Sequence, residues 1–177
     1  GINSDMIFMS FVNREEDILE LRNKTKKNLI IIAKIETKLG VQNISDICKV
    51  ADALLIDRGD LSREISISNI PTAVSSILQQ AKVNNIPAYV ATNVLDSMMT
   101  SSLPSRAEIS DIYNLFEKGA YGLVLAAETA IGSNPVESVA VLEHMRQKYE
   151  HNKLDISIFA QPKRDELEEY PHLYNWL

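Results

Sequence analysis

The sequence predicts an α/β fold built on a parallel sheet of about five βα units. Three observations lead to this prediction: short apolar runs recur along the chain, polar turns follow them, and longer amphipathic stretches separate them. Each apolar run is nearly continuous, which is typical of parallel strands that are covered on both faces. We therefore expect a central sheet with helices packed against it.

The apolar runs give the expected strands. They are Met6 to Phe11, Leu29 to Ile35, Ala53 to Ile56, Ala88 to Ala91 and Gly122 to Ala126. The amphipathic stretches give the expected helices, at Glu15 to Lys24, Asn43 to Val50, Pro71 to Asn84, Ser105 to Lys118 and Pro135 to Tyr149. Two helix starts carry clear signals. Asn134 precedes a proline, and Ser105 stands three residues before Glu108 in the pattern of a capping box.

Composition narrows the class of protein. The chain has 177 residues, of which 45% are hydrophobic and 24% charged, as expected for a globular domain with a sizeable core. A formal net charge of -6 argues against nucleic-acid binding. No apolar run approaches the roughly 20 residues of a membrane helix, and no signal peptide opens the chain, so we expect no membrane contact and a cytoplasmic location. The single Cys48 is expected to be a buried thiol.

The composition changes after residue 149. From Glu150 onward, charged and aromatic residues predominate, with Pro162 and Pro171 and no clear period. We therefore expect a domain over residues 1–149 and a C-terminal tail or appendage over residues 150–177.

Polar residues follow the predicted strands, at the edge where parallel βα folds build their sites. Lys34 and Glu36 are two residues apart and so share one face of a strand, and Asp60 ends the neighbouring strand beside them. A cation and two carboxylates at one place suit a hard divalent metal with an enolate or carboxylate ligand.

Each of these residues also has a plainer interpretation. Lys34 and Glu36 fit a simple ion pair, Glu36 and Asp60 fit helix caps, and Thr92 is an ordinary strand residue. Glu108 fits a structural capping role better than a catalytic one. The role of Glu128 stays open.

Several linked motifs resemble the pyruvate kinase family. They are Ile31-Ile32-Ala33-Lys34-Ile35-Glu36, Arg58-Gly59-Asp60-Leu61, Ala91-Thr92, Pro104-Ser105-Arg106-Ala107-Glu108, Glu128-Thr129-Ala130 and Pro135-Val136-Glu137. Their order over about 150 residues is similar to strands four to eight of that family's TIM barrel. The resemblance therefore implies a partial TIM (β/α) barrel of the phosphoenolpyruvate/pyruvate type.

The resemblance also implies roles for single residues. Glu36 and Asp60 would hold Mg²⁺ or Mn²⁺ against phosphoenolpyruvate or pyruvate, and Lys34 would stabilise the enolate during phosphoryl transfer to ADP. Backbone N–H groups at Arg58 and Gly59 would bind the substrate carboxylate. Thr92 would bind the substrate and take part in protonating the enolate carbon.

Some parts of the family pattern are missing or changed. Ala126-Ala127 replaces a family Ser-Gly, and Asp57 replaces a small apolar residue. The lid, the first three barrel strands and the C-terminal domain have no counterpart, and with them the K⁺ and ADP/ATP contacts. We therefore expect the chain to be incomplete as an enzyme on its own.

Five strands cannot close an eight-stranded barrel, which leaves two sheet edges open for pairing. We expect a homo-oligomer or a complementary half-barrel chain as the partner. Two other functions remain open: a metal-dependent pyruvate-enolate aldolase or lyase, which would need no nucleotide, and a non-catalytic degenerate domain used for assembly or regulation.

Overall fold

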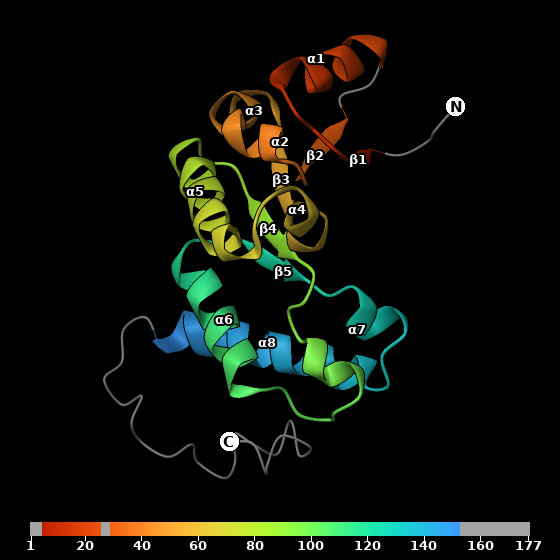
Figure 1. The fold of residues 1–177 in the computed structure, drawn as a ribbon, viewed down its shortest axis with the longest axis vertical. Helices are drawn as coiled ribbons and strands as arrows, with labels where there is room; N and C mark the ends of the chain where they lie inside the picture. Colours follow the sequence, from red (N-terminus) through yellow and green to blue (C-terminus); the bar gives the residue numbers. More distant parts are fainter. Residues whose placement is uncertain (1–4, 26–28, 153–177) are drawn as a thin grey trace. The chain divides into compact units, whose positions relative to one another are not determined.

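The computed structural model, which describes residues 5–25 and 29–152, contains one parallel sheet of five strands in the order β1-β2-β3-β4-β5 (Figure 1). The strands are β1 (Met6–Met9), β2 (Ile30–Ile35), β3 (Ala53–Asp57), β4 (Ala88–Ala91) and β5 (Gly122–Val124). Each strand pairs in parallel with the next one along the chain. The predicted α/β fold with five parallel strands in one open sheet is confirmed.

All five predicted helices are present, with ends that differ by up to three residues. They are α1 (Glu15–Lys24), α3 (Ile44–Val50), α5 (Ile70–Val83), α6 (Arg106–Glu117) and α8 (Pro135–Asn152). The sequence did not predict the short helices, which are α2 (Lys38–Gln42), α4 (Arg58–Glu64), α7 (Ala127–Ala130), and the 3₁₀ turns η1 (Ile67–Asn69) and η2 (Asp96–Met99). No helix among the described residues is both long enough and apolar enough to cross a membrane.

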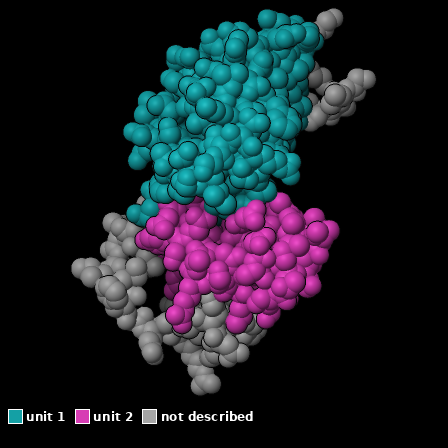
Figure 2. Space-filling model, viewed as in Figure 1, with its two compact units in different colours: residues 1–92, 117–124 teal, residues 93–116, 125–177 magenta. Residues whose placement is uncertain are grey.

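The chain divides into two compact units, shown in different colours in Figure 2. Residues 1–92 and 117–124 form the first unit, which therefore contains the whole sheet. Residues 93–116 and 125–177 form the second. Helix α8 continues past the predicted boundary at residue 149, and residues 153–177 lie outside the described part of the chain. The predicted tail over residues 150–177 thus stays a prediction.

One face of the sheet is buried in the first unit along β2, β3 and β4. Its side chains alternate along the strands and include Ile31, Ala33, Ile35, Leu54, Ile56 and Val90. Helix α5 packs against β3, α3 packs against α5, and α1 packs against α3. Cys48, on α3, is buried in this layer as predicted, and its burial raises the pKa of the thiol to about 11.

The opposite face of the sheet is buried only in part. Ile32, Ala53, Leu55 and Ala91 form a buried apolar cluster there. At the β1 edge, however, Met6 is 46% exposed, Phe8 is 59% exposed and Ile30 on β2 is 45% exposed. The expectation that β1 is covered on both faces is therefore wrong. The strand has only one neighbour in the sheet, and its alternate apolar side chains face outward.

Two acidic residues of the second unit hold its loops in place. Glu108 accepts hydrogen bonds from the backbone N–H of Ser105 and of Ser97, at 2.6 and 2.7 Å, and the Ser105 hydroxyl accepts one from the N–H of Glu108. This arrangement confirms the predicted capping box. Glu128, which is 2% exposed, has a similar role in the loop that follows β4 and is described below.

Candidate functional site

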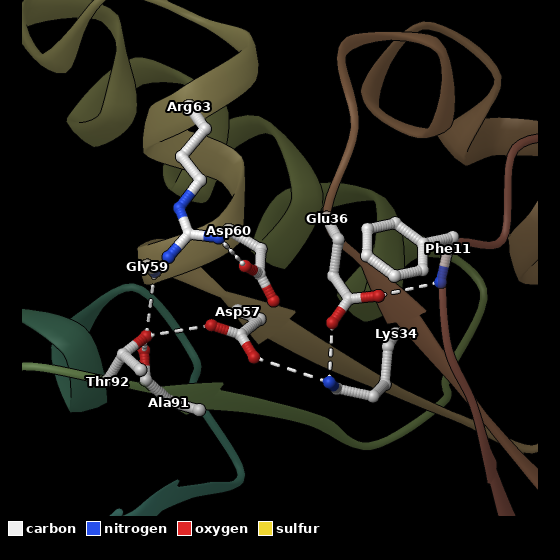
Figure 3. A network of polar contacts seen from close by, with 9 residues as sticks. All are labelled: Phe11, Lys34, Glu36, Asp57, Gly59, Asp60, Arg63, Ala91 and Thr92. Carbon is white, nitrogen blue, oxygen red and sulfur yellow. Dashed lines mark hydrogen bonds and ion pairs between the residues drawn. The ribbon is translucent and has the colours of Figure 1, made fainter. Parts of the chain in front are cut away.

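The carboxyl ends of β2, β3 and β4 meet in the first unit and bring together most of the predicted site residues (Figure 3). Lys34 is the second-last residue of β2, Asp57 is the last of β3, and Thr92 directly follows β4. The register pairs Lys34 with Leu55, two residues before Asp57. Alternation along the strands then places the side chains of Lys34 and Asp57 on the same face of the sheet.

Lys34 lies between two carboxylates. Its ammonium forms an ion pair with Oε1 of Glu36 and a second one with Oδ2 of Asp57, at 3.3 Å. Partial burial disfavours the charged lysine, but the two carboxylates outweigh that effect and raise the pKa of Lys34 above its usual value. Lys34 therefore carries its positive charge throughout the physiological pH range.

The Glu36 carboxylate is buried to 1% exposure and is held from two sides. Its Oε2 accepts a hydrogen bond of 2.6 Å from the backbone N–H of Phe11, while Oε1 contacts Lys34. The helix-cap interpretation of Glu36 is wrong, because Thr37 is the N-cap of α2 and accepts the hydrogen bond from Gly40. Burial of a carboxylate is costly unless it is paired, so Lys34 and the Phe11 amide stabilise Glu36 in this position.

Asp60 does not end a strand, as the sequence had suggested, because β3 stops at Asp57 and α4 begins at Arg58. Asp60 instead lies in the first turn of α4, and its Oδ1 is 3.3 Å from Nη1 of Arg63. One carboxylate oxygen of each of Glu36, Asp57 and Asp60 nonetheless lies within 4.8 Å of the other two. The predicted metal ligands are thus close together, with Asp57 as a third carboxylate.

These three carboxylates fit a divalent cation. Mg²⁺ binds oxygen ligands at about 2.0–2.1 Å in octahedral geometry, so two ligand oxygens are about 2.9 Å apart when adjacent and about 4.2 Å apart when opposite. One oxygen of each carboxylate lies within 4.8 Å of the others, so the three would have to move closer together around the ion. Hard carboxylate oxygens also match the preference of Mg²⁺ and Mn²⁺.

Thr92 links β4 to the start of α4. Its Oγ1 accepts a hydrogen bond from the backbone N–H of Gly59, at 2.9 Å, and has two acceptors for its single proton, Oδ1 of Asp57 at 3.0 Å and the carbonyl oxygen of Ala91 at 2.5 Å. The Arg58 guanidinium donates to the carbonyl of Thr92 through Nε and Nη2, at 3.1 and 2.8 Å. The structure therefore gathers Arg58, Gly59 and Thr92 as predicted, but the Gly59 N–H proposed for a substrate carboxylate already has a partner.

The backbone at the end of β4 adopts an unusual conformation. Thr92 and Asn93 have φ values of +68° and +52°, in the left-handed region that β-branched residues rarely occupy. Gly59 also approaches Thr92 closely, because a Cβ at position 59 would lie 3.2 Å from Cγ2 of Thr92. Strained backbone of this kind is typical of functional sites, and here it directs the Thr92 hydroxyl toward Asp57 and Gly59.

Sequence reasoning missed two residues of the site and left one open. Asp57 was noted only as an unusual residue, although a charged residue that ends an apolar strand beside Lys34 is itself a signal. Phe11 gave no signal, because its contribution is a backbone N–H group. Glu128 is resolved as structural: its buried carboxylate accepts backbone hydrogen bonds from Val94, Leu95 and Ala126.

A comparison with known proteins agrees with this geometry. Residues 1–139 match a family model described as "Pyruvate kinase, barrel domain". The chain is 38% identical over 145 residues to a pyruvate kinase of Thermotoga maritima, covering 80% of this chain and 31% of that protein. It is 40% identical over 141 residues to a pyruvate kinase of Methanocaldococcus jannaschii, covering 78% of this chain and 32% of that protein.

A solved structure gives the same result. The chain resembles a crystal structure of a pyruvate kinase from Cryptosporidium parvum with a TM-score of 0.80 and 33% sequence identity, over 84% of this chain and 32% of that one. The chain thus spans about a third of the length of the relatives that it matches.

Proposed function

Because the chain belongs to the pyruvate kinase family, by its barrel domain, we propose that it binds a divalent cation together with phosphoenolpyruvate or pyruvate and serves phosphoryl transfer to ADP. The observation that carries the proposal is the convergence of Lys34 with the carboxylates of Glu36 and Asp60 at the carboxyl ends of adjacent strands. A cation site with a fixed lysine beside it suits an enolate, whose negative charge both would stabilise.

Glu36 and Asp60 are the proposed ligands of the cation, which is Mg²⁺ or Mn²⁺. Glu36 is rigid because it is buried and its second oxygen binds the Phe11 amide. Asp60 is more exposed, and among the described residues it pairs with Arg63 of its own helix, so it can turn toward a cation at little cost. When bound, the cation supplies positive charge to the oxygens of the substrate.

Lys34, Arg58, Gly59 and Thr92 are the proposed substrate-binding groups. The Lys34 ammonium would stabilise charge on the enolate oxygen and on the transferred phosphoryl group, and its raised pKa keeps it charged for that purpose. Gly59, at the start of α4, allows a carboxylate close to the backbone. Thr92 places a hydroxyl beside these groups, where it would take part in proton delivery.

Titration with Mn²⁺, followed by electron paramagnetic resonance of the free ion, tests the cation site. We expect one strong site in the wild-type chain and its loss in Asp60→Asn. The matched control is Asp46→Asn, which removes a carboxylate that pairs with Lys49 on α3. Equal Mn²⁺ binding by both variants would show that Asp60 is not a ligand.

The proposal extends to a partner for the open sheet. The edge strand β1 exposes the apolar side chains of Met6 and Phe8, and the neighbouring strand β2 exposes Ile30. Such an edge favours pairing with another strand. We propose that further barrel strands cover it, supplied by a second copy of the chain or by a complementary half-barrel chain. Sedimentation velocity of the purified chain over a range of concentrations tests the first case, because self-association through a second copy would increase with concentration.

A further inference from the structure

Asp57 occupies the centre of the polar network in Figure 3, where it contacts two of the groups that are proposed to bind substrate, Lys34 and Thr92. One carboxylate oxygen pairs with the Lys34 ammonium at 3.3 Å, and the other accepts the Thr92 hydroxyl at 3.0 Å. One of its oxygens also lies within 4.8 Å of an oxygen of Glu36 and of an oxygen of Asp60. A single side chain therefore touches the lysine, the threonine and the cluster of carboxylates.

Two hydrogen-bond donors of the site, the Lys34 ammonium and the Thr92 hydroxyl, contact Asp57. The ammonium also pairs with Glu36, the hydroxyl also lies 2.5 Å from the carbonyl oxygen of Ala91, and the Gly59 amide donates to Thr92. An anionic substrate that binds Lys34 or the Thr92 hydroxyl competes with the Asp57 carboxylate for them. It must also approach a negative charge, which costs free energy at these short distances.

Asp57 should favour the binding of a cation, in contrast to its effect on an anion. Three carboxylates and one lysine leave the cluster with a formal charge of about -2, whereas without Asp57 the charge would be about -1. A divalent cation gains from the additional carboxylate, either through direct coordination or through attraction over a few ångströms. Asp57 thus strengthens the binding of the cation and weakens the binding of the anion.

We propose that Asp57 sets the selectivity of this site, strengthening divalent-cation binding in the absence of substrate and weakening the binding of the enolate-like anion that follows. The inference rests on the proposed function, because it concerns the same cation and substrate. Asp57 acts on the substrate through Lys34 and Thr92 and is in that respect a positioning residue. It requires no chemical step beyond binding.

Two isothermal titrations on each variant test this inference. The first adds Mn²⁺ alone, and the second adds oxalate, a planar mimic of enolpyruvate, to the chain saturated with Mn²⁺. For Asp57→Asn, which keeps the size of the side chain and an oxygen to accept the Thr92 hydroxyl, we expect Mn²⁺ to bind about tenfold more weakly and oxalate at least threefold more tightly. Asp57→Ala should change both affinities in the same directions.

The two affinities are expected to change in opposite directions, and this distinguishes a role of Asp57 in selectivity from a purely structural role. A loss of folding or of site geometry would weaken both ligands together, so parallel losses in Asp57→Asn would overturn the inference, as would two unchanged affinities. Asp46→Asn removes the same charge from an exposed pair on α3 and should change neither titration. If the wild-type chain binds neither Mn²⁺ nor oxalate, the proposed function fails and the inference fails with it; wild-type binding with an unaltered Asp57→Asn defeats the inference alone.

Discussion

The hydroxyl of Thr92 donates a hydrogen bond of 3.0 Å to the carboxylate of Asp57, which joins the end of β4 to the end of β3. The same hydroxyl accepts the backbone N–H of Gly59 at the start of α4. Thr92, whose backbone φ is +68°, therefore connects two strands and a helix at the candidate site through its side chain. Its removal should affect both the stability of the first unit and the arrangement of the site.

Thr92→Val tests this connection, because valine has nearly the same shape but no hydroxyl. The Gly59 amide then loses its acceptor and Asp57 loses a donor, which should lower the free energy of unfolding by about 1–3 kcal/mol. Urea denaturation followed by circular dichroism measures the change. Thr92→Ser keeps the hydroxyl and serves as the control; a serine variant as unstable as the valine variant would mean that the methyl group, not the hydrogen bonds, is important.

Lys34→Met tests how the buried charges are balanced. Without the ammonium, the carboxylates of Glu36 and Asp57 face each other in a largely buried position, and we expect the free energy of unfolding to fall by about 3 kcal/mol. Mn²⁺ should restore part of this loss by replacing the missing cation, so its effect on the unfolding temperature should exceed that in the wild type. Lys49→Met, at an exposed pair on α3, should change little. An equal response to Mn²⁺ in wild type and Lys34→Met would contradict this account.

Glu128→Gln tests the structural role of Glu128. Burial raises the pKa of this carboxyl, but the hydrogen bonds from Leu95, Ala126 and Val94 outweigh burial and lower it. Ionised Glu128 thus stabilises the folded state above its unfolded pKa near 4.5, and this contribution is lost as the pH falls through the lower folded pKa. We expect Glu128→Gln to lose about 1.5–3 kcal/mol at pH 7 and to converge with the wild type in acid.

Denaturation at several pH values measures that difference. Glu117→Gln, an exposed position at the end of α6, is the control and should match the wild type throughout. A constant deficit of Glu128→Gln from pH 7 to pH 3 would show that ionisation of Glu128 does not matter.

Phe8→Lys tests the open edge of the sheet. Phe8 is 59% exposed on β1, and a lysine there places a charge on the surface proposed to pair with another strand. If the chain forms homo-oligomers through this edge, the variant should dissociate at concentrations where the wild type is associated. Val83→Lys changes an even more exposed apolar residue at the end of α5 and should keep the wild-type assembly state. Unaltered sedimentation of Phe8→Lys would exclude this edge as the self-association surface.

The sequence predicted the sheet and the long helices because their signals are local. Continuous apolar runs marked the strands, and the capping pattern at Ser105 and Glu108 marked the start of α6. The short helix α4 was missed because its residues, Arg58 to Glu64, follow the strand directly and have no apolar period. The sequence did predict two open sheet edges, but the exposure of Met6 and Phe8 depends on β1 being one of them, which the strand order in the structure supplies.

The sequence predicted those contacts of the site that are made by side chains close together in the chain. Lys34 and Glu36 are two residues apart on one strand and do form the expected ion pair. The contribution of Phe11 to Glu36 spans 25 residues and uses a backbone amide, which no pattern of side chains reveals. The central position of Asp57 depends on the register of β2 and β3, which only the structure supplies.

The most direct test of the central claim is calorimetric titration of oxalate into the purified chain with and without Mn²⁺, alongside Asp60→Asn. We expect oxalate to bind the wild-type chain only when the metal is present, and not to bind Asp60→Asn, while circular dichroism shows that both proteins are folded. Oxalate binding that is the same without metal, or the same in Asp60→Asn, would contradict the claim that Glu36 and Asp60 hold a cation for an enolate substrate. A folded wild-type chain that binds no oxalate under either condition would contradict it as well.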